Sequence, residues 1–154
     1  MNQLRFFVAA LALVAGSAWA QVSVTAPWVR ATVPAQKSTG VYLHLVSPTA
    51  TRLVGVSSPV ATSAELHQME MKGEIMKMRQ VDGIELPAGK AVDMASGTYH
   101  IMLVGLKRQL NDGDAVPLTL MVQGKDKKRE TITLKVPVKP IGFVSAVAAP
   151  AMHP

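Results

Sequence analysis

Short pairs of histidine and methionine are the residues of this chain best suited to chemistry. They form two His-x-Met pairs and one Met-x-Met pair: His67 with Met69, His100 with Met102, and Met76 with Met78. The sequence contains no cysteine. Imidazole nitrogen and thioether sulfur suit monovalent copper, because soft sulfur matches a soft ion, whereas carboxylates favour harder metals. The lack of cysteine also excludes a blue-copper electron-transfer site, which needs a thiolate ligand.

Strands must bring these separated residues together. Side chains two apart on a strand point to the same face, with their backbones about 6.6–6.8 Å apart along it. His100 and Met102 therefore project together. A tight connection at Gly73 joins the segment of His67 to that of Met78, which predicts a hairpin. The segment of His100 must then reach this hairpin by a crossover of the Greek-key kind.

The pattern of the chain is that of an all-β protein. Short runs rich in β-branched and aliphatic residues alternate with clusters of Gly, Pro, Asn, Asp and Ser. The runs predict strands at 22–25, 40–46, 52–57, 64–71, 75–80, 91–93, 100–104, 116–122 and 130–136. Many short strands with regular turns favour a β-sandwich or a Greek-key barrel over an α/β arrangement.

Other methionines and histidines have simpler interpretations. Taken singly, four methionines are predicted to fill the core: Met69, Met71, Met94 and Met121. His44, between two leucines, is predicted to be an ordinary strand residue. His153, beside Met152, offers donors for Cu(II), but the sequence does not decide whether they bind it.

The N-terminus predicts export. Arg5 precedes an apolar stretch over 6–16 that is too short to span a bilayer, and Ala18-Trp19-Ala20 resembles a cleavage site. We therefore expect residues 1–20 to be a signal peptide cleaved after Ala20, rather than a membrane anchor, because no charged stop-transfer flank follows. No later segment is long and apolar enough to cross a membrane. Residues 21–139 are predicted to form one β-sandwich domain, and the Ala/Pro-rich residues 140–154 a flexible tail.

Composition limits the remaining function classes. The formal net charge is +6, and apart from a run at 125–129 the basic residues are scattered. We interpret that run as a solvated hairpin tip, and nucleic-acid binding is not expected of an exported protein. Without disulfides, stability must come from packing alone. No nucleophile–base constellation suggests an enzyme.

The stretch 65–122 resembles the PCuAC-type periplasmic copper chaperones. Their signature is a His, ten intervening residues, a Met, twenty-one intervening residues, then His-x-Met. Here His67, Met78, His100 and Met102 match it in type and spacing. The segments 76–79, 81–83, 86–89, 99–103 and 113–118 also resemble the family, as do 26–28 and 40–42 near the N-terminus. Gln80 stands where the family commonly carries proline.

The resemblance implies a cupredoxin-like Greek-key β-sandwich that binds Cu(I) through His67, Met78, His100 and Met102. It implies a periplasmic carrier that delivers copper for cytochrome c oxidase assembly. Its partners would be a copper-acceptor protein such as an oxidase subunit, or a thiol-bearing copper carrier. Met69 and Met76 would shield the site or serve as transient ligands. Trp28 and Tyr99 are expected to be structural, although either ring could cover the site.

Two alternatives use the same residues differently. A periplasmic copper buffer or resistance protein would sequester the ion rather than deliver it. A metal-free exported β-sandwich would instead bind another protein, since this fold class hosts many functions.

Overall fold

In the computed structural model, residues 21–95 and 98–145 are described, and every regular element among them is a β-strand. The strands are β1 (Ser23–Arg30), β2 (Ser38–Val46), β3 (Thr51–Ser57), β4 (Ala61–Lys72), β5 (Ile75–Gln80), β6 (Ile84–Leu86), β7 (Ala91–Asp93), β8 (Tyr99–Leu106), β9 (Ala115–Gly124) and β10 (Arg129–Lys139). Each predicted strand occurs, and the prediction of an all-β fold is confirmed. β6 was not predicted, because its three residues lie between turn signals. No helix that could cross a membrane is found in the described residues.

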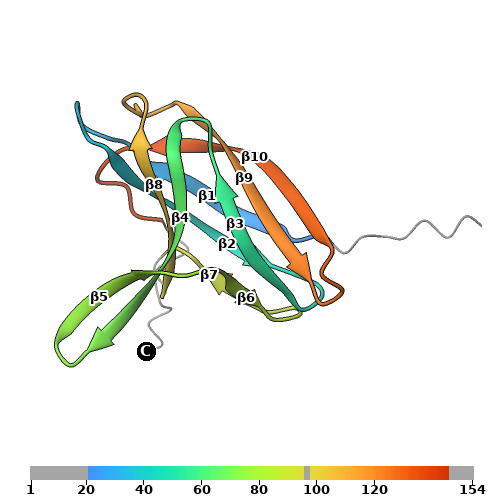
Figure 1. Ribbon diagram of the computed structural model, residues 1–154. Coiled ribbons are helices and arrows are strands. Elements are labelled where there is room, and N and C mark those ends of the chain that lie inside the picture. The colour runs from blue at the N-terminus through green and yellow to red at the C-terminus, as the bar shows by residue number, and fades with distance from the viewer. Residues whose placement is uncertain (1–20, 96–97, 146–154) are drawn as a thin grey trace, which may run out of the picture.

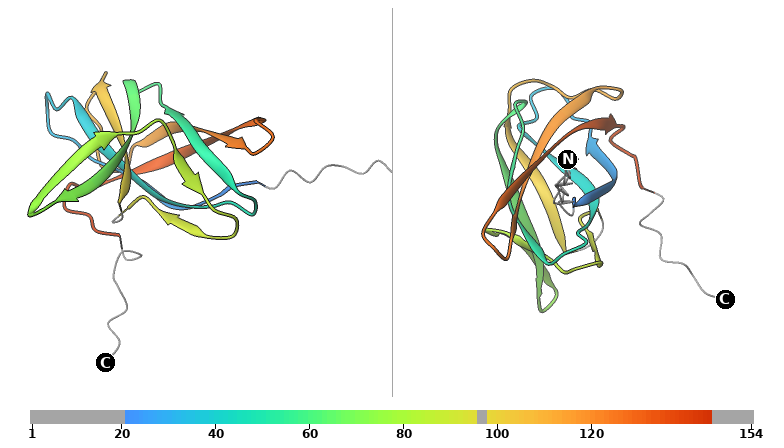
Figure 2. Two further views of the ribbon diagram at one scale, coloured as in Figure 1. Left: turned by 60° about the horizontal axis from the view of Figure 1, so that its bottom comes forward. Right: turned by 90° about the vertical axis from the view of Figure 1, so that its right-hand side faces the viewer.

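Hydrogen bonds link the strands into one continuous path that folds back on itself (Figure 1). The order is β5-β4-β8-β2-β1-β10-β9-β3-β6, and β7 pairs with the end of β2. The parallel pairing of β1 with β10 joins two antiparallel halves. Because the halves face each other, they form the predicted Greek-key β-sandwich (Figure 2). Neighbours such as β4 and β8 are far apart in the sequence, as a crossover connection requires.

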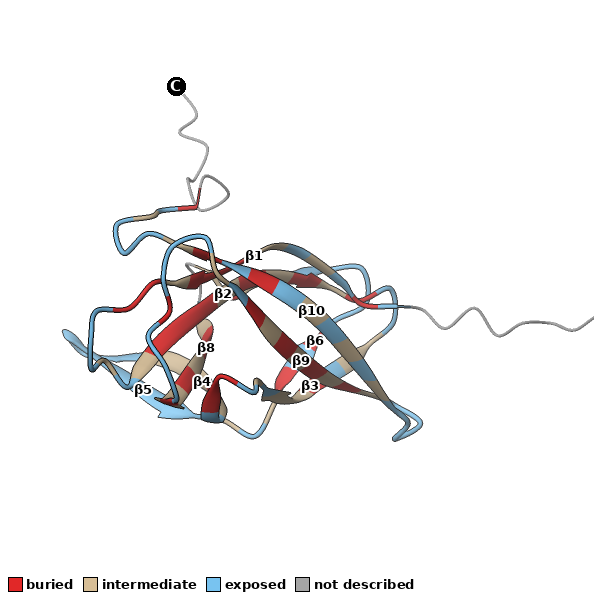
Figure 3. Ribbon diagram, turned by 90° about the horizontal axis from the view of Figure 1, so that it is seen from above, coloured by how far each residue is buried: buried red, intermediate tan, exposed pale blue. Residues whose placement is uncertain are grey.

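Buried residues recur along the central strands (Figure 3), and their side chains form one hydrophobic core. Leu43 of β2, Ile101 of β8 and Leu120 of β9 are fully buried. Burying one such side chain stabilises the fold by about 1.5–3 kcal/mol relative to leaving it exposed. Met94 is also fully buried, which confirms its prediction as core filler.

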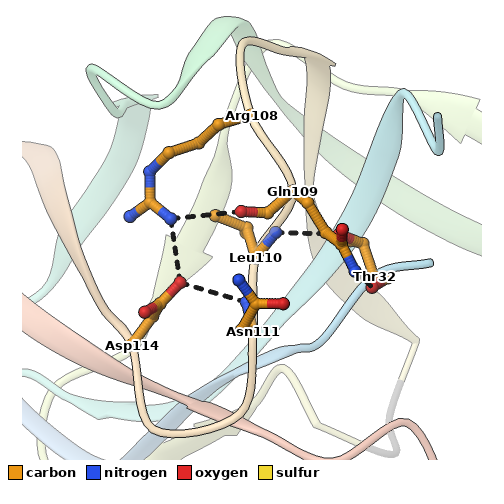
Figure 4. A network of polar contacts seen from close by, with 6 residues as sticks. All are labelled: Thr32, Arg108, Gln109, Leu110, Asn111 and Asp114. Atoms are coloured by element: carbon orange, nitrogen blue, oxygen red, sulfur yellow. Dashed lines mark hydrogen bonds and ion pairs between the residues drawn. The ribbon is translucent and has the colours of Figure 1, made fainter. Parts of the chain in front are cut away.

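The loop between β8 and β9 is fixed by polar contacts (Figure 4) and by Leu110, which is fully buried in the core. Asp114 accepts hydrogen bonds from the Arg108 guanidinium at 2.8 Å and from the Asn111 backbone N–H at 3.0 Å. The Asn111 backbone, and then Arg108, hold the pKa of Asp114 below its ordinary value. The Leu110 N–H donates to the Thr32 hydroxyl at 2.9 Å, which ties the loop to the segment after β1.

The β4–β5 hairpin extends beyond the body of the sandwich (Figures 1 and 2). β4 pairs with β8 as far as Gln68, the Met69 N–H donates to the Thr98 carbonyl at 2.6 Å, and residues 70–72 then pair with β5 alone. Every residue of β5 is exposed. Gly73 at the tip has φ of 65°, a left-handed conformation that glycine adopts without the steric cost of a Cβ.

Residues 140–145, where the predicted tail begins, lie against the outer face of β1 and β2. Phe143 packs edge-on against Trp28, with ring centroids 4.9 Å apart, and Trp28 stacks on Tyr42 at 4.4 Å. The Arg30 guanidinium lies over the rings of Trp28 and Tyr42 and donates to the Ile141 carbonyl at 2.7 Å. Trp28 is thus part of the packing of this face. The predicted signal peptide, and the tail residues 146–154 with Met152 and His153, lie outside the described residues.

Candidate metal centre

His67 and His100 meet across two adjacent strands. They are paired in register on β4 and β8, and their ring centroids are 5.4 Å apart at an interplanar angle of 70°. Their chain neighbours Leu66 and Ile101 point into the core. Because strand side chains alternate between faces, both imidazoles project from the outer face.

Met78 and Met102 lie beside this histidine pair. Met102 is the next same-face residue after His100, and Met78 pairs with Met69, the next same-face residue after His67. A hollow of about 290 Å³ is lined by Tyr42, Met69, Met78, Ala95, Tyr99, His100 and Met102. Three of the four predicted ligands therefore share one hollow. His67 adjoins it through its contact with the ring of His100.

Glu65 orients the His67 ring. The carboxylate oxygen Oε2 of Glu65 lies 2.8 Å from Nε2 of His67. A proton on Nε2 donates to this carboxylate, which leaves the lone pair on Nδ1. Nδ1 is buried and has no hydrogen-bond partner among the described residues. The ring thus holds one nitrogen in a fixed hydrogen bond and leaves the other nitrogen available to a ligand.

His100 is the more enclosed of the two histidines, with 8% of its surface exposed. Burial lowers its pKa from the ordinary value of 6.5, and the nearby His67 lowers it further. Both causes disfavour the charged form. They therefore favour the neutral form of His100, in which imidazole can bind a metal ion.

The surroundings of the histidine pair are asymmetric. His100 is closed off by the sheet, whereas Met78 has 59% of its surface exposed. An ion held among these side chains would be buried on the sheet side and accessible on the hairpin side. Among the described residues, no three His, Cys, Asp or Glu side chains are grouped so as to hold a metal ion, so the donors gathered here are imidazole and thioether.

The prediction that single methionines fill the core is wrong at three positions. Met71 has 59% of its surface exposed, and Met69 lines the hollow. Both share the face of His67, which points away from the core. Met121 is half-buried on the outer face of β9, next to Arg129. His44 is a strand residue, as predicted, and its Nδ1 lies 3.5 Å from Asp93.

Two residues of the site were not predicted. Glu65 stands two positions before His67, so the period of two along a strand could have placed it on the same face. Tyr42 reaches the hollow from β2, whose Gly40 pairs with Met102. A Cβ at Gly40 would lie 2.5 Å from the Tyr42 hydroxyl oxygen, so glycine makes room for this ring.

Comparison with known proteins places the chain in a family. The profile of the LpqE-like lipoprotein family matches residues 22–138. The chain belongs to the LpqE-like family. This LpqE-like chain is 35% identical to lipoprotein Lxx21020 of Leifsonia xyli subsp. xyli over 88 residues, which are 56% of the chain and 51% of the relative. It is 31% identical to protein RP573 of Rickettsia prowazekii over 123 residues, 76% of the chain and 67% of that protein. The chain thus spans about half the length of the first of these relatives.

Solved structures share the fold of the LpqE-like chain. The copper-bound PCuAC domain of PmoF2 superimposes with a TM-score of 0.62 at 25% identity, covering 77% of this chain and 92% of that domain. Apo-DR1885 of Deinococcus radiodurans gives 0.58 at 30% identity, covering 91% and 93%. The Cu(I) form of DR1885 gives 0.56 at 30% identity, covering 80% and 83%. The resemblance to PCuAC domains and their cupredoxin-like β-sandwich is confirmed.

Proposed function

We propose that this LpqE-like protein is a Cu(I) metallochaperone whose ligands are His67, Met78, His100 and Met102. The observation that carries the proposal is the pairing of His67 with His100 beside a hollow that Met78 and Met102 line. The similarity to the copper-bound PCuAC domain of PmoF2 and to Cu(I)-DR1885 supports a copper-handling role. The donor set supports the monovalent state, because neutral thioethers favour a soft ion.

The buried Nδ1 of His67 has the property that a metal ligand needs, a lone pair that no hydrogen bond from the described residues uses. A buried imidazole nitrogen without a partner loses its hydrogen bond to water and gains nothing in return. A bound ion would satisfy it. A metal-binding histidine commonly donates its other ring N–H to a carboxylate, and Glu65 offers that carboxylate at 2.8 Å.

The same chemistry suits delivery. Thioethers are neutral and hold Cu(I) without the strong bonds that thiolates form, so a thiolate-rich acceptor can take the ion by stepwise ligand exchange. Because Met78 is exposed, the first ligand exchange with such an acceptor can take place at its sulfur. We propose that the protein carries copper and does not catalyse a reaction.

We place this carrier in the periplasm. The pattern over 1–20 supports export with cleavage after Ala20, and the family is described as lipoprotein-like. Delivery for cytochrome c oxidase assembly is the proposed destination. The acceptor is then an oxidase subunit or a thiol-bearing copper carrier.

The test is an anaerobic titration of the mature protein with Cu(I) against a competing chelator. The proposal expects tight one-to-one binding that weakens by at least tenfold in Met78→Leu and in His100→Ala. Met121→Leu, on the far half of the sandwich, is the matched control and should leave the affinity unchanged. An affinity equal to wild type in both site variants would refute the assignment. Failure of the wild type to bind copper would favour the metal-free interaction module.

X-ray absorption of the copper-loaded protein gives an independent measurement. It should count two sulfur and two nitrogen neighbours. A deletion strain then separates delivery from buffering. Loss of oxidase activity at low copper supports delivery, whereas copper sensitivity with normal respiration supports a buffer or resistance protein.

A further inference from the structure

We propose that the exposed end of the β4–β5 hairpin holds a second, weaker Cu(I) site, made of the thioethers of Met71 and Met76 together with that of Met69. This inference rests on the proposed function for the nature of the ion. It adds a metal site outside the four residues assigned above.

Strand register places the four sulfurs together. Met69 pairs with Met78, and Met71 pairs with Met76, on successive same-face positions of the hairpin. Cβ atoms of directly opposed residues in an antiparallel pair lie about 4.5–5.5 Å apart. The next same-face pair lies about 6.6–6.8 Å along the strand. Methionine has three rotatable bonds beyond its Cα, so thioethers at these spacings can converge on one ion.

The two faces of the hairpin differ in chemistry. On the face opposite the methionines, Arg79 donates to Gln68 at 3.0 Å and lies 3.7 Å from the Glu70 carboxylate. Lys72 and Lys77 occupy that face too, with Ile75 as its one apolar member. On the other face, the two cross-strand pairs nearest the turn are both made of methionine: Met71 with Met76, and Met69 with Met78. Alternation between sulfur and charge is thus maintained along both strands.

Exposure distinguishes this face from ordinary packing. Met71 has 59% of its surface exposed and Met76 has 56%, whereas Met94 in the core has none. Beyond Gln68 no third strand of the described chain pairs with the hairpin, and only the Met69 N–H still donates sideways, to the Thr98 carbonyl. Large apolar side chains forgo the free energy of burial when they stay exposed to water, so exposed methionines suggest a role other than packing. Methionine is also enriched at protein interfaces, but the side chains exposed on this end of the face are all thioethers, the soft donors that Cu(I) prefers.

The position of the second site relates it to the first. Met69 and Met78 line the hollow together with His100 and Met102. An ion held by Met71 and Met76 would therefore lie one cross-strand pair away from the primary ligands. Its ligands are neutral and exposed, so it would bind more weakly than the site that contains two imidazoles.

The experiment labels the methionine methyl groups with ¹³C and follows their NMR signals as Ag(I), a redox-inert mimic of Cu(I), is added. Signals are assigned by single Met→Leu substitutions. The first equivalent should move the signals of Met78 and Met102. The second should move those of Met71 and Met76, while Met121 remains still as an internal reference. Immobile Met71 and Met76 signals up to three equivalents would overturn the proposal.

A double variant, Met71→Leu with Met76→Leu, provides the second measurement. Leucine keeps the apolar volume and removes the sulfur. This variant should bind one Cu(I) where the wild type binds two, and its first affinity should stay within threefold of wild type. Met121→Leu is the matched control and should still bind two. Retention of the second ion by the double variant, or a tenfold loss of the first affinity, would overturn the inference.

Failure here can be told apart from failure of the proposed function. If the first equivalent moves Met78 and Met102 but the second leaves Met71 and Met76 still, the primary site stands and the hairpin site does not. If the first equivalent does not move Met78 and Met102, the primary assignment fails, and the signals of Met71 and Met76 still report on the hairpin by themselves.

Discussion

His67 and His100 occupy directly opposed positions on β4 and β8, with their ring centroids 5.4 Å apart. A positive charge on either ring opposes a charge on the other, and this repulsion is one cause of the lowered pKa of His100. A cuprous ion bound between the rings would require both to be neutral. The pair is therefore the part of the site on which pH should act.

Copper affinity should fall in acid. Each histidine that must lose a proton weakens binding by about tenfold per pH unit once the pH is below its pKa, which is ordinarily about 6.5. We expect the Cu(I) affinity to be nearly constant from pH 7 to 8 and to fall below about pH 6. The thioethers should retain a residual affinity in acid. Chelator competition at a series of pH values measures it. A flat curve from pH 5 to 8 would argue against histidine ligation.

Removing Glu65 should weaken the metal site without unfolding the protein. Loss of a carboxylate that orients a metal-binding histidine costs about 10–100-fold in metal affinity. We expect that loss in Glu65→Ala and a smaller one in Glu65→Gln, whose amide oxygen can still accept from His67. Glu85→Gln, which removes a surface ion pair with Arg52, is the control and should bind copper as wild type. Equal affinities in all three variants would mean that Glu65 does not position His67.

The metal-free protein should be less stable in acid, and His100 should contribute to this loss. Because its pKa is lowered in the folded state, the unfolded chain binds a proton more readily as the pH falls below 6.5. The free energy of unfolding should therefore decrease with falling pH from that point downward, and be unaffected by His100 above it. Urea unfolding of wild type and His100→Gln should show a shallower pH dependence in the variant. Parallel curves would contradict this role.

Core and hairpin substitutions should separate stability from copper binding. Leu43→Ala removes a fully buried side chain and should lower the free energy of unfolding by about 2–5 kcal/mol. Met71→Leu alters an exposed residue and should stay within about 0.5 kcal/mol of wild type. Urea denaturation measures both. A large destabilisation by Met71→Leu would mean that the hairpin methionines support the fold.

The strands were predictable because their signal is local. The alternation of buried and partly buried residues in β2 and β9 follows the period of two in the sequence. β1 begins near its predicted start but runs on through Pro27 to Arg30, past an irregularity at Ala26, where φ is 48°. A positive φ at alanine has no signature in the sequence, so the second half of this strand was missed.

The site was only partly predictable. The residue types and the hairpin that joins His67 to Met78 follow from spacing. The pairing of His67 with His100 depends on the register of two strands that are distant in the sequence, and a shift by one residue would send one ring into the core. The contribution of Tyr42 depends on its neighbour Gly40 and on the strand order β8-β2. Neither is a local property.

The exposure of the hairpin methionines also makes them vulnerable to oxidants. Conversion of methionine to its sulfoxide replaces a soft, apolar thioether by a polar group. Met71, Met76 and Met78 each have more than half of their surface in contact with solvent, whereas the side chain of Met94 is sealed in the core. Oxidative damage would therefore reach the sulfurs that we propose as copper ligands first and leave the packing of the sandwich intact, so that a repair reductase could restore the protein without refolding it.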